Sequence, residues 1–273
     1  MMDLIWLVPL GFVVGAFGTL IGAGGGFILV PILLMIYPDK SPETITSISL
    51  AVVFFNALSG SFAYAKMKKI DYKSGLIFAM ATIPGSLLGS ITTSYMPRRL
   101  FDGVFGILII LLSLYLFKKK PNTGMNQIKE LRFKMTRKMV DQTGGTYEYS
   151  YNLAIGIVLS LFVGYLSSLL GIGGGIIHVP ALIHLLNFPV HLATATSQFI
   201  LVIAAFTGST MHVVRGELSD GILQVAGLSL GVIFGAQLGA KFSKKIQGNL
   251  IIRALAIALG IVGIRIILMA FYR

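Results

Sequence analysis

Long apolar runs dominate the pattern of hydrophobic and polar positions along this chain. Four of them lie at residues 45–64, 74–95, 100–117 and 250–271. Each is about 18 to 22 residues long, the length that a helix rising 1.5 Å per residue needs to cross a hydrocarbon layer of about 30 Å. The pattern predicts membrane-spanning helices, and therefore an all-α polytopic membrane protein.

Two further apolar stretches, at residues 4–37 and 151–186, are too long for one ordinary span. Three successive glycines interrupt each stretch: Gly24, Gly25 and Gly26 in the first, and Gly173, Gly174 and Gly175 in the second. A glycine inside a helix costs about 1 kcal/mol relative to alanine. Three in succession are expected to break the helix, so we predict two helical arms joined by a glycine turn in each stretch.

The glycine motif is part of an internal duplication. Residues 22–31 (GAGGGFILVP) recur as residues 171–180 (GIGGGIIHVP), at an offset of 149 residues. Further matches keep nearly this offset: Thr46 with Thr194, Ser49 with Ser197, Gly85 with Gly235, and Gly89 with Gly239. Several matches in one register indicate a true repeat. The chain is therefore divided into an N-terminal repeat (1–117), a polar basic linker (118–150) and a C-terminal repeat (151–273).

Basic residues decide between two topologies. If each glycine-broken stretch enters the membrane and returns, most lysines and arginines lie on one face together with the linker. The positive-inside rule favours this arrangement over eight simple spans. Each half then makes three crossings and one hairpin, which predicts inverted repeats. We expect the linker, at most partly helical, in the cytoplasm, both termini outside, and the protein in the cytoplasmic membrane of a bacterium.

Composition excludes several other classes of protein. The chain is 55% hydrophobic and 12% charged, whereas soluble domains carry roughly 25% charged residues. The net charge of +12 is explained by basic residues that flank spans, so we expect the lipid bilayer as a partner and no nucleic acid. The chain has no cysteine, hence no disulfide or thiolate metal site, and no cofactor is expected. A homo-oligomer is compatible with the sequence.

Helices that begin inside a membrane favour a ligand of negative charge. The second arm of each stretch begins at the glycines, so its unpaired amides and positive dipole end face the membrane interior. Such ends are ready anion sites, and glycine lets a ligand approach the backbone closely. The alternative is that the glycines only allow tight helix packing. The duplication, with Pro31 matching Pro180, favours the anion site.

Hydroxyl and amide side chains begin the spans that follow. Thr46 and Ser49 are three residues apart and share a helix face, as do Thr194 and Ser197. Gln198 follows the second pair, and Asn56 is a candidate in the first half only. These uncharged side chains are predicted to flank the anion. The alternative for the hydroxyls is a hydrogen bond to their own helix backbone.

Acidic residues are informative by their positions. All ten lie near predicted span ends or in loops, and no buried carboxylate is expected, which argues against a metal-cation carrier. No histidine spacing indicates a metal site. His178 replaces Leu29 of the first half, so it is the candidate for proton coupling, with a buried hydrogen-bonded histidine as the alternative.

The repeated Gly-x-Gly-Gly-Gly followed by Val-Pro, with the Thr/Ser-rich start of the next span, resembles the TauE/SafE sulfite exporter family, also called the toluenesulfonate uptake permease family. The resemblance covers nearly the whole chain. It implies a secondary transporter of small sulfur-containing anions, such as sulfite or sulfoacetate, coupled to a proton gradient. The alternative is a channel, or a carrier of another oxyanion, a carboxylate or a metal cation. An enzyme is not expected, because no Ser/His or Asp/Asp pair and no nucleophile elbow is found.

Overall fold

The computed structural model of the protein describes residues 2–118 and 133–243, with residues 253, 256–257, 260–261 and 263–268. The first half contains α1 (Met2–Ile21), α2 (Gly26–Ile36), α3 (Pro42–Lys66), α4 (Tyr72–Thr93) and α5 (Arg98–Lys118). The second half contains α6 (Leu153–Leu170), α7 (Gly175–His184), α8 (Val190–Val214), the short 3-10 turn η1 (Ser219–Gly221) and α9 (Ile222–Ser243). Residues 263–268 are also helical.

The helices have the length and composition of a membrane protein. Five described segments are long and apolar enough to cross a bilayer: α3, α4, α6, α8 and the segment of η1 and α9. Shorter apolar helices are α2, α7 and the part of α1 at residues 6–21. The prediction of a mostly helical, multi-pass membrane protein is confirmed.

Local sequence determines where the long helices begin. Ser41 precedes Pro42 and accepts a hydrogen bond from a backbone amide of the first turn of α3, while Asp71 and Asn152 cap α4 and α6 in the same way. Such side chains satisfy amides that have no partner within the helix. The starts of α2 and α7 differ, because their N-cap residues are Gly25 and Gly174, which have no side chain to donate or accept.

Packing between the helices follows the duplication. α1 packs along α9, α6 packs along α4, and α3 packs against α8. Close approach depends on glycine: a Cβ on Gly85 of α4 would lie 2.1 Å from the carbonyl oxygen of Leu161, and one on Gly235 of α9 would lie 2.1 Å from that of Phe12. The two contacts occupy equivalent places in the repeats. Each half therefore packs its first helix against the fourth helix of the other half.

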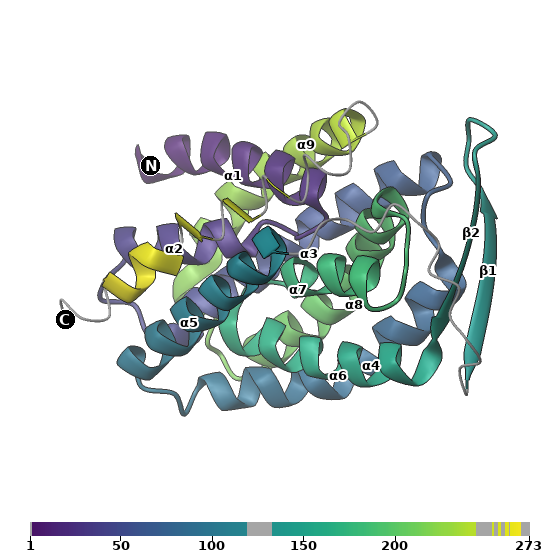
Figure 1. The fold of residues 1–273 in the computed structure, drawn as a ribbon. Helices are drawn as coiled ribbons and strands as arrows, with labels where there is room; N and C mark the ends of the chain where they lie inside the picture. The colour runs from purple at the N-terminus through teal and green to yellow at the C-terminus, as the bar shows by residue number, and fades with distance from the viewer. Residues whose placement is uncertain are drawn as a thin grey trace.

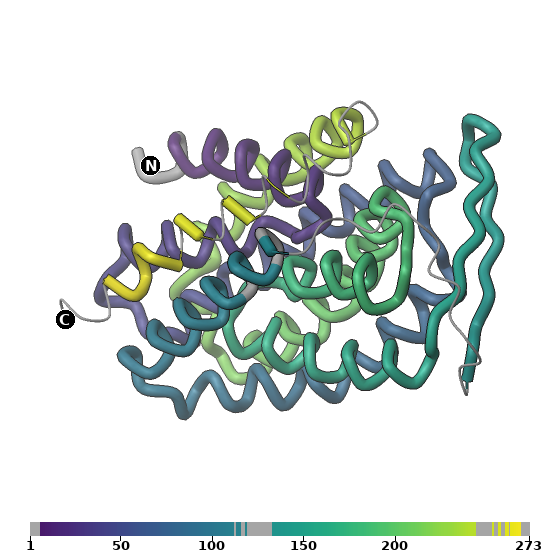
Figure 2. The backbone as a smooth tube through the Cα atoms, in the orientation of Figure 1, coloured from purple at the N-terminus to yellow at the C-terminus, as the bar shows by residue number. Residues whose placement is uncertain are grey.

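The backbone path shows where the segments lie. The chain doubles back at the glycine turn between α1 and α2, so the two helices form a hairpin (Figure 2). The start of α1 and residues 263–268 lie at one end of the bundle, and the two strands lie at the other end (Figure 1).

A β-hairpin corrects the expectation for the linker. Strands β1 (Lys134–Val140) and β2 (Thr146–Asn152) pair antiparallel, with Arg137 opposite Tyr149. The linker (118–150) was expected to be at most partly helical, and its described part instead forms strands at residues 134–140 and from residue 146 onward. The signal was the alternation of tyrosine with polar residues at 146–151, a period-2 pattern that predicts a half-buried strand. Residues 119–132 of the linker lie outside the described part of the chain.

Buried carboxylates correct a second expectation. Asp71 and Asp102 are buried, at 0% and 2% exposure, although no buried carboxylate was expected. Both lie near helix starts and are paired with arginine: Arg137 Nη2 is 2.8 Å from Asp71 Oδ1, and Arg98 Nε is 3.1 Å from Asp102 Oδ1. They are structural ion pairs rather than open cation ligands.

The Asp71 pair fastens the β-hairpin to the bundle. Tyr149 donates a hydrogen bond of 2.7 Å to Asp71, and Ser74 also donates to this carboxylate. Burial by itself raises the pKa of Asp71, but the hydrogen bonds from Arg137, Ser74 and Tyr149 outweigh it and leave the pKa lowered. Asp71 is therefore ionised at neutral pH and holds the arginine of β1.

We expect Arg137→Gln to loosen the hairpin without unfolding the bundle. Removing one partner of a buried ion pair leaves an uncompensated charge, at a cost on the order of 2 kcal/mol for this partly exposed arginine. Amide hydrogen exchange in β1 and β2 should then accelerate about 30-fold, since 1.4 kcal/mol corresponds to a factor of ten.

The control is Lys138→Gln, because Lys138 is exposed on the outer face of β1. It should leave the exchange rates unchanged. Equal exchange in both variants would contradict this role of the ion pair.

The ion pair also predicts a dependence on pH. Because the pKa of Asp71 in the folded protein is lowered, acidification through and below the ordinary range of aspartate should also release the hairpin.

Candidate functional site

The two glycine turns meet in the middle of the bundle. A Cβ on Gly26 would lie 2.7 Å from the carbonyl oxygen of Gly171, and one on Gly175 would lie 2.3 Å from that of Gly22. The start of each short helix therefore lies against the turn of the other half. Six glycines of the turns have left-handed φ angles: Gly22, Gly24, Gly25, Gly171, Gly173 and Gly174. Side chains rarely adopt this conformation, so both the backbone and the contact require glycine.

The turns break the helices as the sequence predicts, and leave amides unpaired. α2 begins at Gly26 and α7 at Gly175. Among the hydrogen bonds of the described residues, none engages the N–H groups of Gly25 and Phe27, or of Gly174 and Ile176. A helix start carries about half a positive charge in addition to these free donors. Both ends are buried within protein, where an unpaired amide is costly.

Four predicted hydroxyls surround the turns, but their protons are engaged. Ser49 donates to the carbonyl of Gly171 at 2.6 Å, and Ser197 donates to the carbonyl of Gly22 at 3.0 Å. Each serine thus holds the glycine turn of the opposite half. In this structure these two hydroxyls support the turns rather than point free donors at an anion.

The hydroxyls of Thr46 and Thr194 bond to the backbone of their own helices, which was the alternative to binding the anion. Thr46 donates to the carbonyl of Glu43 at 3.0 Å, and Thr194 donates to that of Val190 at 2.9 Å. Their backbones nevertheless lie against the turns: the Cα of Thr46 approaches Gly171, and that of Thr194 approaches Gly22. The structure therefore brings all four residues to the site, as packing and supporting groups.

Asn56 and Gln198 have unpaired polar atoms beside the first turn. Both side chains are fully buried. Asn56 accepts from Thr19 at 3.0 Å, and Gln198 donates to the carbonyl of Gly18 at 3.2 Å. Among the described residues, the amide nitrogen of Asn56 and the amide oxygen of Gln198 have no partner. Buried polar atoms without a partner are rare and indicate a place for a ligand or water.

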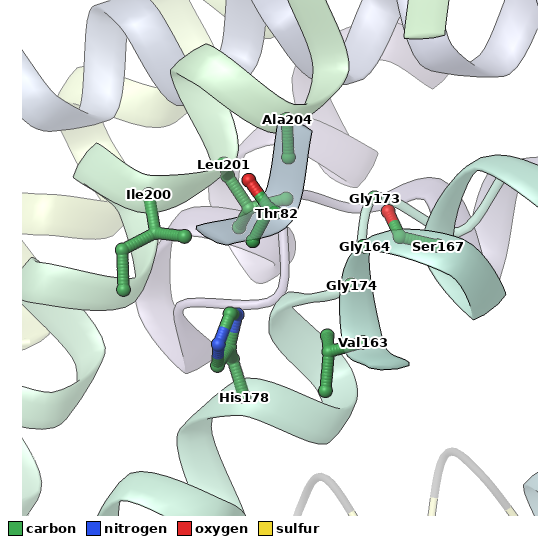
Figure 3. Close-up of a pocket in the computed structure, with 10 residues that line it drawn as sticks. All are labelled: Thr82, Val163, Gly164, Ser167, Gly173, Gly174, His178, Ile200, Leu201 and Ala204. Atoms are coloured by element: carbon green, nitrogen blue, oxygen red, sulfur yellow. The ribbon is translucent and has the colours of Figure 1, made fainter. Parts of the chain in front are cut away.

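A narrow pocket adjoins the second turn. Its walls include Thr82 from α4, Ser167 from α6, the turn at Gly173 and Gly174, and His178 from α7 (Figure 3). It has no space large enough to seat a water molecule. Its described walls contain no aspartate or glutamate. The site is therefore closed in this structure and carries no negative charge of its own.

Two polar residues of this pocket make it different from the first half. His178 is buried and its Nε2 lies 3.1 Å from Ser160 Oγ. Ser167 is 1% exposed, and its hydroxyl has no partner among the described residues. Neither Ser160 nor Ser167 was among the residues predicted from the sequence. Their signal is a hydroxyl within an otherwise apolar span.

The described residues contain no group of three or more His, Cys, Asp or Glu side chains suited to hold a metal ion.

Comparisons with known proteins agree with the membrane architecture. Residues 7–266 match the family model described as "Sulfite exporter TauE/SafE". The chain is 37% identical over 272 residues to the "Probable membrane transporter protein YunE" of Bacillus subtilis, covering 97% of this chain and 98% of that protein. It is 26% identical to the "Probable membrane transporter protein MJ0441" of Methanocaldococcus jannaschii, covering 96% and 94% of the two chains. No solved structure matches.

The family model covers nearly the whole chain, and these relatives are similar over almost their full length. The protein is a membrane transporter that belongs to the TauE/SafE sulfite exporter family.

Proposed function

We propose that the protein is a secondary transporter of small sulfur-containing anions, such as sulfite or sulfoacetate, and that the anion binds at the two glycine turns. The family description supplies the substrate class. The free amides of two helix starts supply the sign of the charge. This pair of buried helix starts is the observation that carries the proposal.

Electrostatics support an anion over a cation. Two helix starts together present about one positive charge to the space between them. In a medium of low dielectric constant this charge acts over a few ångströms with little screening. The unpaired hydroxyl of Ser167 adds an uncharged donor. A site of this kind binds an anion through dipoles and does not trap it by a full opposite charge.

The arrangement of the halves supports transport by alternating access. The proposed topology is inverted, with the linker in the cytoplasm and both ends of the chain outside. The reciprocal packing of α1 with α9 and of α6 with α4 is what inverted repeats would produce. The position of the β-hairpin at the end opposite the start of α1 agrees with three crossings per half (Figure 1). Rocking of one half against the other would expose the site to each side in turn.

The closed pocket fits one stage of this cycle. The site beside Gly174 is too narrow for a water molecule, so an anion can enter only when α6, α7 and α8 separate. His178 would then meet the anion from α7.

A panel of anions tests the substrate class. We expect sulfite, thiosulfate or sulfoacetate to raise the thermal stability of the purified protein, because a ligand that binds only the folded state stabilises it. At a concentration of about 100 times Kd the gain is about 2.7 kcal/mol. Magnesium and choline, each as the chloride salt, should produce no shift beyond that of sodium chloride. A shift with a cation and none with any anion would contradict the proposal.

A single methyl group tests the site. In Gly174→Ala the added Cβ would lie 3.1 Å from both Ser167 Oγ and Val163 Cγ1, filling the pocket and covering the turn amide. Loss of one hydrogen bond to a charged ligand costs about 1.5 to 3 kcal/mol, which predicts a loss of anion flux into proteoliposomes of about tenfold or more.

Gly144→Ala is the matched control. Gly144 has φ +84°, similar to the +72° of Gly174, but a Cβ there meets nothing within 4 Å. Both variants carry the strain of a left-handed alanine, about 1–2 kcal/mol, while only one touches the site. Equal flux in the two variants would place the anion elsewhere.

A further inference from the structure

A second polar cluster lies at the turn that follows α8. Glu217 is its centre: one carboxylate oxygen accepts hydrogen bonds from Ser94 at 2.7 Å and from Arg215 at 2.8 Å, and the other pairs with Nδ1 of His212. The His212 side chain is fully buried, while that of Glu217 is 11% exposed. The pair thus joins a carboxylate near the surface to an imidazole inside the protein.

The cluster lies at the end of the bundle away from the β-hairpin. It contacts the first turns of α3 through Ser47, whereas the hairpin is fastened to Asp71, beyond the last turn of α3. α3 has 25 residues, which corresponds to about 37 Å at 1.5 Å per residue. In the proposed topology this end faces the outside.

The second ring nitrogen of His212, Nε2, is not used by the pair with Glu217. Nε2 is buried and has no hydrogen-bond partner among the described residues. In the first half the equivalent residue is Tyr64, whose hydroxyl donates to the carbonyl of Thr19 at 2.9 Å. The hydroxyl of Ser168, the counterpart of Thr19, is likewise unpartnered and lies against Gly208, one turn before His212. The second half thus has His212 where the first half has Tyr64, and Nε2 of His212 has no partner among the described residues.

The net charge around His212 would be neutralised by one added proton. The charged groups that face His212 are Glu217 and Arg215 from the turn after α8, and Glu43 from the first turn of α3. Two carboxylates and one guanidinium around a neutral imidazole give a local charge of about −1. One added proton would neutralise the cluster.

The cluster is connected to the second glycine turn. Ser47 donates to the backbone carbonyl of Glu217 at 3.3 Å. Its neighbours Thr46 and Ser49 are the residues of α3 that lie against, and bind, Gly171. A displacement of the Glu217 segment would therefore act on the helix that holds the anion site.

We propose that the His212–Glu217 pair is the site that binds the proton transported with the anion; this inference rests on the proposed anion transport. The neutral imidazole donates its Nδ1–H to Glu217, so a proton taken from this side binds the unpartnered Nε2 and gives an imidazolium beside a carboxylate. It leaves from the same nitrogen when the protein opens to the other side. His178, the candidate from the sequence, bonds to Ser160, and no described carboxylate hydrogen-bonds to it.

The test separates proton coupling from anion transport. Purified full-length protein is reconstituted in liposomes with the membrane voltage clamped, and radiolabelled sulfoacetate is the probe, because its acidic groups are ionised near neutral pH. One readout is sulfoacetate exchange at equal pH, and the other is its accumulation under a gradient of one pH unit. One coupled proton predicts about tenfold accumulation by the wild-type protein, since one pH unit is 1.36 kcal/mol.

His212→Asn keeps a donor for Glu217 but cannot accept a proton. We expect it, and Glu217→Gln, to exchange sulfoacetate at the wild-type rate and to lose the accumulation. His191→Gln removes a histidine near the start of the same helix and should keep it. Wild-type accumulation in both His212→Asn and Glu217→Gln would overturn the proposal, as would loss of exchange together with accumulation, which would indicate a structural role. Absence of any anion flux in the wild-type protein would instead overturn the proposed function.

Discussion

A helix that is interrupted inside a membrane must have its exposed backbone satisfied by protein, and this constraint organises the structure. Lipid offers no hydrogen-bond partners, so a glycine turn at membrane depth is tolerated only when other residues cover it. Here each half covers the turn of the other half. Ser49 binds the carbonyl of Gly171, and Ser197 binds that of Gly22. The carbonyls of the turns are thereby satisfied, while several amides at the helix starts stay free.

The same contacts connect the turns to the two ends of the bundle. Between Thr194 and Ser197, Thr196 accepts a hydrogen bond from the backbone amide of Asp71 at 3.0 Å, and the Asp71 carboxylate holds Arg137 of the β-hairpin. In α3, Ser47 lies between Thr46 and Ser49 and donates to the backbone carbonyl of Glu217. Each turn is thus held by a helix whose start is bonded to a charged cluster at one end of the bundle.

The two clusters differ in chemistry. Arg137 and Asp71, whose pKa is lowered, form a pair that stays ionised at neutral pH. The His212–Glu217 pair contains the one side-chain type that ordinarily titrates between pH 5 and 8. In the proposed cycle, the two ends of the bundle would therefore differ in their response to protons.

Much of this could be read from the sequence, and the failures have physical causes. The apolar runs and the breaks at Gly24–Gly26 and Gly173–Gly175 follow from periodicity and repetition, and the family from the resemblance of the repeated glycine motif. The β-hairpin was missed because a basic linker was judged by charge rather than by the alternation at 146–151. The state of Thr46 and Ser49 could not be predicted, because a hydroxyl chooses between ligand, helix backbone and a distant carbonyl only in three dimensions. The partners of Asp71, which are Arg137 and Tyr149, come from a segment far away in the chain.

The most direct test of the anion site is to locate a bound anion. Crystals grown with selenite, a heavier analogue of sulfite, would give an anomalous signal from selenium. The account predicts a peak beside Gly174 and Ser167, with oxygen atoms about 3 Å from the amides that begin α7. A saturating concentration of selenite that gave peaks only at lysines or arginines on the surface would contradict it.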